Sequence, residues 1–385
     1  MFITIIIFIL ILGLLVFVHE LGHYVSSKKL GVKAEEFGFG IPPRIFGWKK
    51  INGKRKFFWG NKDVETIKSD DTIWSLNWLP LGGFVKIKGE DGANKADNDS
   101  FASQKAWKRV IILSAGVLMN FVLAAVLLAI AFNIGAPQVI ESTSNSGGII
   151  VGESRVQILQ VVPDSPADKI GLQVGDVIVK INNEKRGVKE LVQKYIAENR
   201  NQDLEFVVER FGEEQIVTIP ALETESSDDR LIGVALIESA IVKYPWYTSI
   251  WLGIKAMVIM TGAIIKAFAL IIRNLFIGMP VGVEVAGPVG IAVLTGQAAK
   301  LGLAYLLQFA AILSINLGII NFMPFPALDG GRVLFILIEK IRRKPISQKI
   351  ENAIHAVGFF LLIFVILLVT IKDLKLGQLF GRIFG

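Results

Sequence analysis

Long apolar runs alternate with polar segments along this chain, and the runs have the length of membrane spans. A helix needs roughly 20 mostly apolar residues to cross a bilayer. Four runs have this length, and they are Phe2 to Tyr24, Trp107 to Phe132, Leu301 to Met323 and Ala353 to Ile371. The pattern therefore predicts an α-helical polytopic membrane protein with four transmembrane helices.

A fifth apolar run, 246–276, differs from these because it carries Lys255, Lys266 and Arg273. The three cations are separated by about three and two helical turns, so they form one stripe along a helix. A single cationic stripe is typical of an amphipathic helix that lies in the membrane interface. We therefore expect an interfacial helix region over 246–292 and not a fifth span.

The segments between the runs contain strand patterns. Residues 26–106 include two stretches rich in glycine, proline and aromatic residues, EFGFGIP and WSLNWLPLGGFVKIKGE, and the second alternates like a hairpin. Alternating apolar residues in DLEFVVER and EQIVTIPAL predict the strands of an inserted α+β domain. The expected parts in chain order are 1–25, 26–106, 107–133, 150–222, 246–292, 301–331 and 352–372.

Composition and charge agree with a membrane protein, since 52% of the 385 residues are apolar and the mean hydropathy is +0.54. The absence of cysteine excludes disulfides and thiolate metal ligands. Residues 25–109 hold 17 Lys and Arg against 10 Asp and Glu, whereas residues 134–245 hold 11 against 18. By the positive-inside rule, 25–109 and 324–351 are cytoplasmic, 134–245 lies outside, and both termini are extracytoplasmic. The net charge of +7 thus reflects topology, and we expect no nucleic-acid partner.

The end of the first apolar run contains the sequence HELGH, with His19, Glu20 and His23. Residues four apart share a helix face, so both histidines can bind one metal ion with the glutamate beside them. H-E-x-x-H is the zincin pattern, in which two neutral imidazoles bind Zn²⁺ and the glutamate is the general base. The alternative is a chance pattern in a helix. Because desolvation of ionisable groups is costly, such groups at membrane depth are read as functional by default.

Catalytic zinc normally has three protein ligands. Without cysteine, the third must be an aspartate, a glutamate or the remaining histidine, His355, which we interpret as a packing or interfacial residue. Asp329 in NFMPFPALDGG is the better candidate, because Pro324 and Pro326 break the third run before it and irregular backbone at membrane depth lines cavities. Its alternative role is a capping residue at a helix end. Asp329 reaches the depth of the histidines only if 246–276 does not cross the membrane.

HELGH, GVLMN, NFMPFPALDGG and the PDZ-like pattern within 150–222 together closely resemble the site-2 protease family of intramembrane zinc metalloproteases. The bacterial regulator-of-sigma-E protease branch is the nearest match. The resemblance covers nearly the whole chain. The better-studied members of that family carry two PDZ domains in tandem, whereas this sequence has one.

The resemblance implies a set of catalytic and binding residues. His19, His23 and Asp329 would bind Zn²⁺, and Glu20 would be the catalytic base. Asn120 from GVLMN would lie near the zinc and could donate to an oxyanion, or it could serve only a helix–helix contact. A membrane-dipping β element would hold an extended substrate strand, unless it is an ordinary surface hairpin. The implied substrate-binding residues are Gly38, Phe39, Gly40, Gly82, Gly83, Phe84, Asn321 and Pro324.

The resemblance also implies an endopeptidase that works within the lipid bilayer of the bacterial inner membrane. Its substrates would be single-span membrane proteins, such as anti-sigma factors or remnant signal peptides. The PDZ-like domain would filter substrates by size or bind a peptide. The alternative class is a non-enzymatic protein, either a membrane metal-ion carrier or a PDZ scaffold. A carrier would tolerate loss of Glu20 as long as metal binding survived.

Overall fold

The computed structural model describes most of the chain, as two compact units. The described residues are 2–51, 53–60, 71–139, 147–162, 165–185, 187–199, 201–210, 212–221, 232–279, 286–344 and 346–383. The first unit comprises Met1–Leu127, Ile254–Gly296 and Phe309–Gly385, and the second comprises Leu128–Gly253 and Gln297–Gln308. Parts of the expected ranges 26–106, 150–222 and 246–292 lie outside the described residues.

Five helices within the described residues are long and apolar enough to cross a membrane. They are α1 (Phe2–Lys29), α2 (Ala106–Ile134), α5 (Trp246–Phe276), α7 (Leu303–Asn321) and the Gln348–Leu374 part of α9 (Gln348–Ile383). The protein is therefore an α-helical membrane protein that also has sheet-rich regions. Length and apolar composition admit α5 in addition to the four spans that the sequence predicts.

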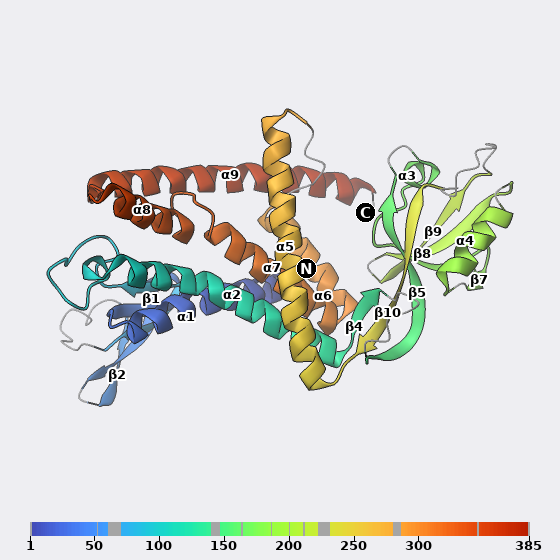
Figure 1. The fold of residues 1–385 in the computed structure, drawn as a ribbon. Coiled ribbons are helices and arrows are strands. Elements are labelled where there is room, and N and C mark those ends of the chain that lie inside the picture. The colour runs from blue at the N-terminus through green and yellow to red at the C-terminus, as the bar shows by residue number, and fades with distance from the viewer. Residues whose placement is uncertain are drawn as a thin grey trace. The chain divides into compact units, whose positions relative to one another are not determined.

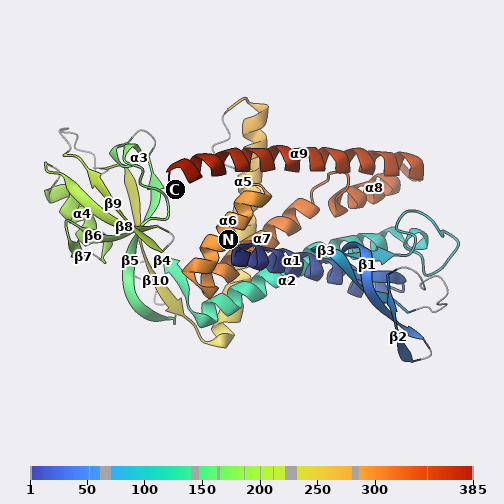
Figure 2. The same ribbon diagram turned by 180° about the vertical axis from the view of Figure 1, so that it is seen from behind.

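α5 differs from the other long helices in packing and direction. None of its most apolar stretch is buried, compared with 39% of the corresponding stretch of α2 and 6% of that of α9. From Ile254 onward, where α5 belongs to the first unit, the helix runs steeply across the direction of α1 and α9 (Figures 1 and 2). These two features separate α5 from the helices that surround the HELGH motif.

The third apolar run forms a shorter helix than expected. α7 ends at Asn321, the chain turns over residues 322–328, and Asp329 begins a separate helix, α8 (Asp329–Arg342). The predicted helix over 301–331 is therefore wrong beyond Asn321. Its physical reason is that Pro324 and Pro326 have no backbone N–H and cannot continue the helical hydrogen bonds. A further helix, α6 (Pro288–Leu301), precedes α7.

A three-stranded antiparallel sheet lies between α1 and α2 in the chain, with the strand order β2–β1–β3. Its strands are β1 (Ala34–Ile51), β2 (Lys54–Trp59) and β3 (Ile73–Ile87). The sheet is larger than the expected hairpin because β1 is long enough to pair with both neighbours. Ring contacts join it to α1, with centroids 5.4 Å apart for Phe17 and Phe37 and 5.2 Å apart for Tyr24 and Trp74.

Small residues bring α1 and α2 into close contact beside the HELGH motif. A Cβ on Gly22 would overlap the backbone oxygen of Ala115, and a Cβ on Gly116 would overlap the ring of His23. α8 packs against α2 and the end of β3 through a buried apolar cluster, made up of Val32, Ile87, Phe101, Ile112, Leu113, Val333 and Ile336. Glycine at the contact therefore holds α1 close to α2, and apolar burial holds α8 against α2.

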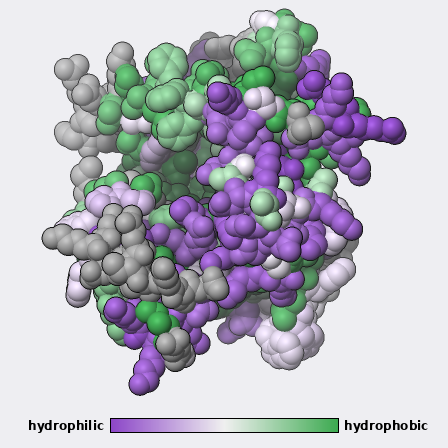
Figure 3. Space-filling model, turned by 90° about the vertical axis from the view of Figure 1, so that its left-hand side faces the viewer, coloured by the Kyte–Doolittle hydropathy of each residue, from purple (hydrophilic) through white to green (hydrophobic). Residues whose placement is uncertain are grey.

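One end of the first unit, which carries β2 and the start of α9, faces the viewer in Figure 3. Hydrophilic residues gather over the middle of this face. Ion pairs occur in the same part of the unit, where Lys88 Nζ lies 2.7 Å from Asp99 Oδ1 and Arg109 Nη1 lies 3.3 Å from Glu339 Oε2. A polar end of this kind suits the water-facing side of a membrane protein.

The second unit is built on a sheet with the strand order β4–β10–β5–β6–β8–β9, and β7 pairs with β6. The strands are β4 (Ala136–Val139), β5 (Ile149–Val161), β6 (Val177–Ile181), β7 (Glu184–Lys185), β8 (Leu204–Arg210), β9 (Glu213–Ile219) and β10 (Val234–Lys243). Helices α3 (Pro166–Lys169) and α4 (Lys189–Glu198) complete the α+β unit. The sheet extends beyond the expected range 150–222, because β10 pairs with β5 along most of its length.

Candidate active site

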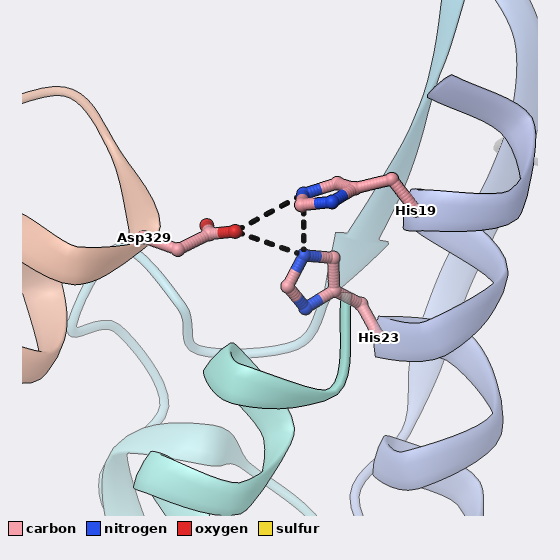
Figure 4. A group of neighbouring side chains, drawn as sticks. All are labelled: His19, His23 and Asp329. Atoms are coloured by element: carbon pink, nitrogen blue, oxygen red, sulfur yellow. Dashed lines mark hydrogen bonds and ion pairs between the residues drawn. The ribbon is translucent and has the colours of Figure 1, made fainter. Parts of the chain in front are cut away.

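Three potential metal donors meet at one point of the first unit, as Figure 4 shows. His19 and His23 come from consecutive turns of α1, and Asp329 is the first residue of α8. The distance from Asp329 Oδ2 is 3.1 Å to His19 Nε2 and 3.2 Å to His23 Nε2, and the two Nε2 atoms are 3.2 Å apart. Both histidines are buried, with 6% and 5% of their surface exposed. The three side chains thus form an almost equilateral triangle of donor atoms.

The triangle fits a single zinc ion. Tetrahedral zinc with bonds of about 2.0–2.2 Å to histidine and carboxylate ligands keeps neighbouring donors about 3.3–3.5 Å apart. The observed separations are only slightly shorter, so a small opening of the triangle would admit the ion. Three protein donors also leave a fourth position for water or substrate, which is the arrangement of catalytic zinc sites. His19, His23 and Asp329 can therefore hold Zn²⁺ with one position open.

The other ring nitrogen of His23 contacts the backbone of α2. His23 Nδ1 lies 2.9 Å from the carbonyl oxygen of Ile112. A carbonyl only accepts, so Nδ1 carries the proton and the Nε2 lone pair faces the other two donors. This contact selects the tautomer that metal binding through Nε2 requires.

His19 is oriented by a side chain from α2. His19 Nδ1 lies 3.1 Å from Nδ2 of Asn120, which is fully buried. Asn120 Oδ1 has no hydrogen-bond partner among the described residues. If the carboxamide turned by 180°, Oδ1 could accept from Nδ1–H of His19, and the buried acceptor would be paired. Asn120 thus contacts the nitrogen that a metal would not use.

Asn321 occupies a different position beside the same histidine. As the last residue of α7, it has its Nδ2 3.5 Å from His19 Nε2, the nitrogen that faces Asp329. Pro324 lies in the turn that follows, and its side chain is exposed. Of the two expected binding residues in this segment, the structure brings Asn321 to the three donors.

Glu20 connects α1 to the margin of the sheet. Its Oε2 accepts a hydrogen bond of 3.0 Å from the backbone N–H of Val85 in β3. Because this N–H donates to Glu20, the margin of β3 after Gly83 lies against α1 at the HELGH motif. A Cβ on Gly83 would lie 4.0 Å from Glu20 Cγ. The carboxylate that follows His19 is thus held in place by the backbone of β3.

The six residues expected in the β element lie where β1 and β3 run side by side. Gly38 is opposite Phe84, and Phe39 is opposite Gly83. A Cβ on Gly83 would lie 2.9 Å from Gly38 O, so glycine permits this close pairing. Gly40 and Gly82 have φ angles of 82° and 85°, which favour glycine at both bends. Of these six residues, Gly83 alone has a described approach to Glu20. The other five have no described contact with His19, His23 or Asp329.

His355 has a role that the sequence interpretation missed. Its Nδ1 accepts a hydrogen bond of 2.8 Å from the backbone N–H of Ala327, two residues before Asp329. The sequence offered one signal, because this is the third and last histidine of the chain and it lies in an apolar run. That signal was weak, since no partner stands at helical spacing from it.

The family model for peptidase family M50 matches residues 7–60 and 55–365. A Clostridium acetobutylicum protein with the provisional name zinc metalloprotease is 32% identical over 372 residues, which cover 97% of each chain. The zinc metalloprotease RasP of Oceanobacillus iheyensis is 29% identical over 97% of this chain and 99% of its own length. RasP of Geobacillus kaustophilus is 29% identical over 97% and 98%. The chain therefore belongs to peptidase family M50 and is an intramembrane zinc metalloprotease of the site-2 protease family.

Proposed function

We propose that this zinc metalloprotease cuts within the transmembrane segments of single-span membrane proteins, with His19, His23 and Asp329 as zinc ligands and Glu20 as general base. The observation that carries the proposal is the triangle formed by two buried histidines and the half-buried Asp329, with Glu20 directly after His19 in the chain. The substrate class follows from the location of this triangle, between helices apolar enough to lie in a bilayer. Anti-sigma factors and remnant signal peptides are substrates of this kind.

Glu20 is suited to remove a proton at the site. His19, His23 and Asp329 would hold Zn²⁺, which would supply a Lewis acid that makes water a stronger acid and nucleophile. Glu20 receives the proton of the attacking water and delivers it to the amine that leaves. The hydrogen bond from Val85 N–H fixes one carboxylate oxygen, and no described residue donates to the other. One oxygen is thus held by the protein while the other can exchange a proton.

Asn321 and Asn120 have different proposed roles at the site. Asn321 lies on the Nε2 side of His19, so its amide can donate to the oxygen that becomes negative when the peptide carbonyl is attacked. Asn120 lies on the Nδ1 side, where it holds the ring of His19 in the orientation that binds metal. The position of Asn120 favours this orienting role over direct donation to an oxyanion.

The margin of β3 is suited to bind the substrate backbone. A peptide bond in a helix is hidden, so the substrate must become extended before it is cut, and an extended chain can pair with a strand edge. The residues from Gly83 to Val85 bring such an edge to Glu20. Gly38, Phe39, Gly40, Gly82 and Phe84 would shape the element that presents this edge.

We propose a topology of four spans in the bacterial inner membrane, with α5 in the interface and both termini outside. The steep direction of α5 relative to α1 and α9, together with its three cations, supports this assignment. Because the chain has no cysteine, single cysteines at Lys344 and Glu184 can be labelled from each side. We expect labelling of Lys344 only from the cytoplasm and of Glu184 only from outside. If Lys344 reacts from outside, α5 crosses the membrane.

We propose that the second unit is a PDZ-like domain that filters substrates by size. Within the part of the chain that the structure describes, β10 pairs with β4 only from Ser239 to Val242, so the edge from Val234 to Glu238 could bind a peptide. The test replaces residues 149–243 with a short linker, since β10 belongs to the same sheet as β5. A filter predicts that substrates with intact outer domains are then cut. Slower cleavage of trimmed substrate, with the bulky one still refused, would support recruitment.

Glu20→Gln tests the main proposal in purified protein with a tagged single-span substrate. The amide cannot accept a proton, so kcat should fall by about 10²–10⁴-fold, the usual contribution of general acid–base catalysis. Zinc content should stay close to wild type, because Glu20 is not a ligand. Val25→Ala, on an exposed position of α1, is the matched control. Proteolysis by Glu20→Gln near the control rate would reject the mechanism, and ion transport that survives in this variant would favour a carrier.

A further inference from the structure

The turn between α7 and α8 places Asp329, and its backbone is held in an unusual way. Pro324 and Pro326 have no N–H to donate, so the turn makes fewer backbone hydrogen bonds than a helix. Ala327 has a φ of 75°, in the left-handed region that residues other than glycine rarely adopt. A conformation of this kind persists only where surrounding contacts hold it.

His355 of α9 supplies such a contact. Its Nδ1 accepts the 2.8 Å hydrogen bond from the backbone N–H of Ala327. An imidazole nitrogen accepts only through its lone pair, so the ring proton is on Nε2. Nε2 is buried and has no hydrogen-bond partner among the described residues. The bond to Ala327 is therefore the one hydrogen bond described for this ring.

Two further contacts press α9 against the same segment. A Cβ on Gly358 would lie 2.5 Å from Pro326 Cβ and 2.7 Å from its carbonyl oxygen, so glycine permits the approach. The ring of His355 is 5.4 Å from the ring of Phe335 on α8, measured between centroids. His355 therefore contacts the chain on both sides of Asp329, before it at Ala327 and after it at Phe335.

We propose that His355 is a positioning residue for Asp329, because it holds the backbone two residues before the aspartate and so directs Oδ2 toward His19 and His23. The inference rests on the proposed function, since it takes Asp329 as the third zinc ligand. A histidine on a packed helix suits this role, because its Nδ1 accepts a hydrogen bond without adding a charge beside the site.

The test compares three substitutions of His355 in the full-length protein. Asparagine places its oxygen as many bonds from Cα as Nδ1 is, whereas glutamine places it one bond farther away. His355→Ala and His355→Gln should weaken zinc affinity and lower kcat by about 10–100-fold, as loss of outer contacts to metal ligands commonly does. His355→Asn should recover most of both. KM should stay within about threefold, because His355 does not contact the substrate.

Zinc affinity is measured by competition with a chelator, so this readout does not depend on proteolysis. Val357→Ala, on an exposed neighbouring position of α9, is the control. Recovery by asparagine alone supports the proposal. Wild-type zinc affinity in His355→Ala, or equal behaviour of asparagine and glutamine, overturns it. If His355→Ala does not fold, the asparagine and glutamine variants decide.

Repeating the His355 substitutions in the Asp329→Ala variant tests whether their effect on zinc affinity depends on Asp329. In Asp329→Ala protein the ligand is already gone, so replacing His355 as well should change the remaining zinc affinity by less than about twofold. A further tenfold loss there would show that His355 acts through something other than Asp329. These outcomes differ from those expected if the proposed function is wrong. In that case the wild-type protein would lack zinc, or Glu20→Gln would remain active.

Discussion

The three proposed zinc donors come from two regions of the chain that bring them to one point in different ways. α1 supplies His19 and His23 from one uninterrupted helix, where a separation of four residues puts them on one face. Asp329 follows an irregular turn whose backbone is held by α9. The histidine pair depends on local geometry, and the aspartate depends on contacts with distant residues. Substitutions far from Asp329 in sequence should therefore weaken zinc binding. Substitutions at exposed positions of α1 should leave it unchanged.

The largest expected effect removes one ligand from each region. His23→Ala and Asp329→Ala both leave two protein donors, so both should lose most of the zinc and all measurable cleavage. Elemental analysis of the purified proteins gives the zinc bound per chain. Wild-type zinc content in Asp329→Ala would assign the third ligand to another residue, and the comparison between helix and turn would then fail.

The two asparagines should separate binding from catalysis. Asn321→Ala removes the proposed donor to the oxyanion, so kcat should fall by about 10²–10³-fold with zinc affinity almost unchanged. Asn120→Ala removes the contact to His19 Nδ1, so zinc affinity should fall by about 10–100-fold. Chelator competition and steady-state kinetics measure the two quantities. The reverse pattern would exchange the roles of the two residues.

Glycines test how tightly the turn is packed. A Cβ on Gly330 would overlap the carbonyl oxygens of Phe322 and Met323, so Gly330→Ala should destabilise the protein by about 1–3 kcal/mol. Gly262 on α5 has nothing within reach of an added Cβ, and alanine there should stabilise the helix by at most about 1 kcal/mol. Thermal unfolding in detergent compares the two. Equal shifts in Tm would mean that the turn can rearrange at little cost.

The smallest expected effect concerns the contact between α7 and α2. Ser314 Oγ donates a hydrogen bond of 2.8 Å to the backbone oxygen of Asn120. Ser314→Ala should cost about 0.5–1.5 kcal/mol of stability and leave zinc affinity unchanged, because the helical hydrogen bonds of α2 still hold Asn120. A loss of zinc affinity above tenfold would show that the position of the histidine pair on α1 also depends on distant contacts.

Sequence reasoning predicted the parts of this protein that depend on local pattern. The apolar runs predicted a helical membrane protein, and the zinc protease family was identified from its motifs. The third run, Leu301 to Met323, matches α7 to within two residues at each end, but the expected third transmembrane helix over 301–331 does not continue beyond Asn321. The β element was predicted as a hairpin but belongs to a three-stranded sheet, because pairing of β2 with β1 leaves little trace in the sequence. The number of spans and the PDZ-like identity of the second unit stay predictions.

The sequence by itself determined that His19, Glu20 and His23 share one stretch of helix, because the spacing of helical residues needs no distant partner. Only the tertiary structure decided that Asp329 completes the group, 306 positions after His23, and that Val85 holds Glu20. The same holds for His355, whose partner is a backbone N–H that no sequence pattern reveals. Contacts between elements depend on how turns and strands pack in three dimensions, and residue spacing along one element carries no information about them.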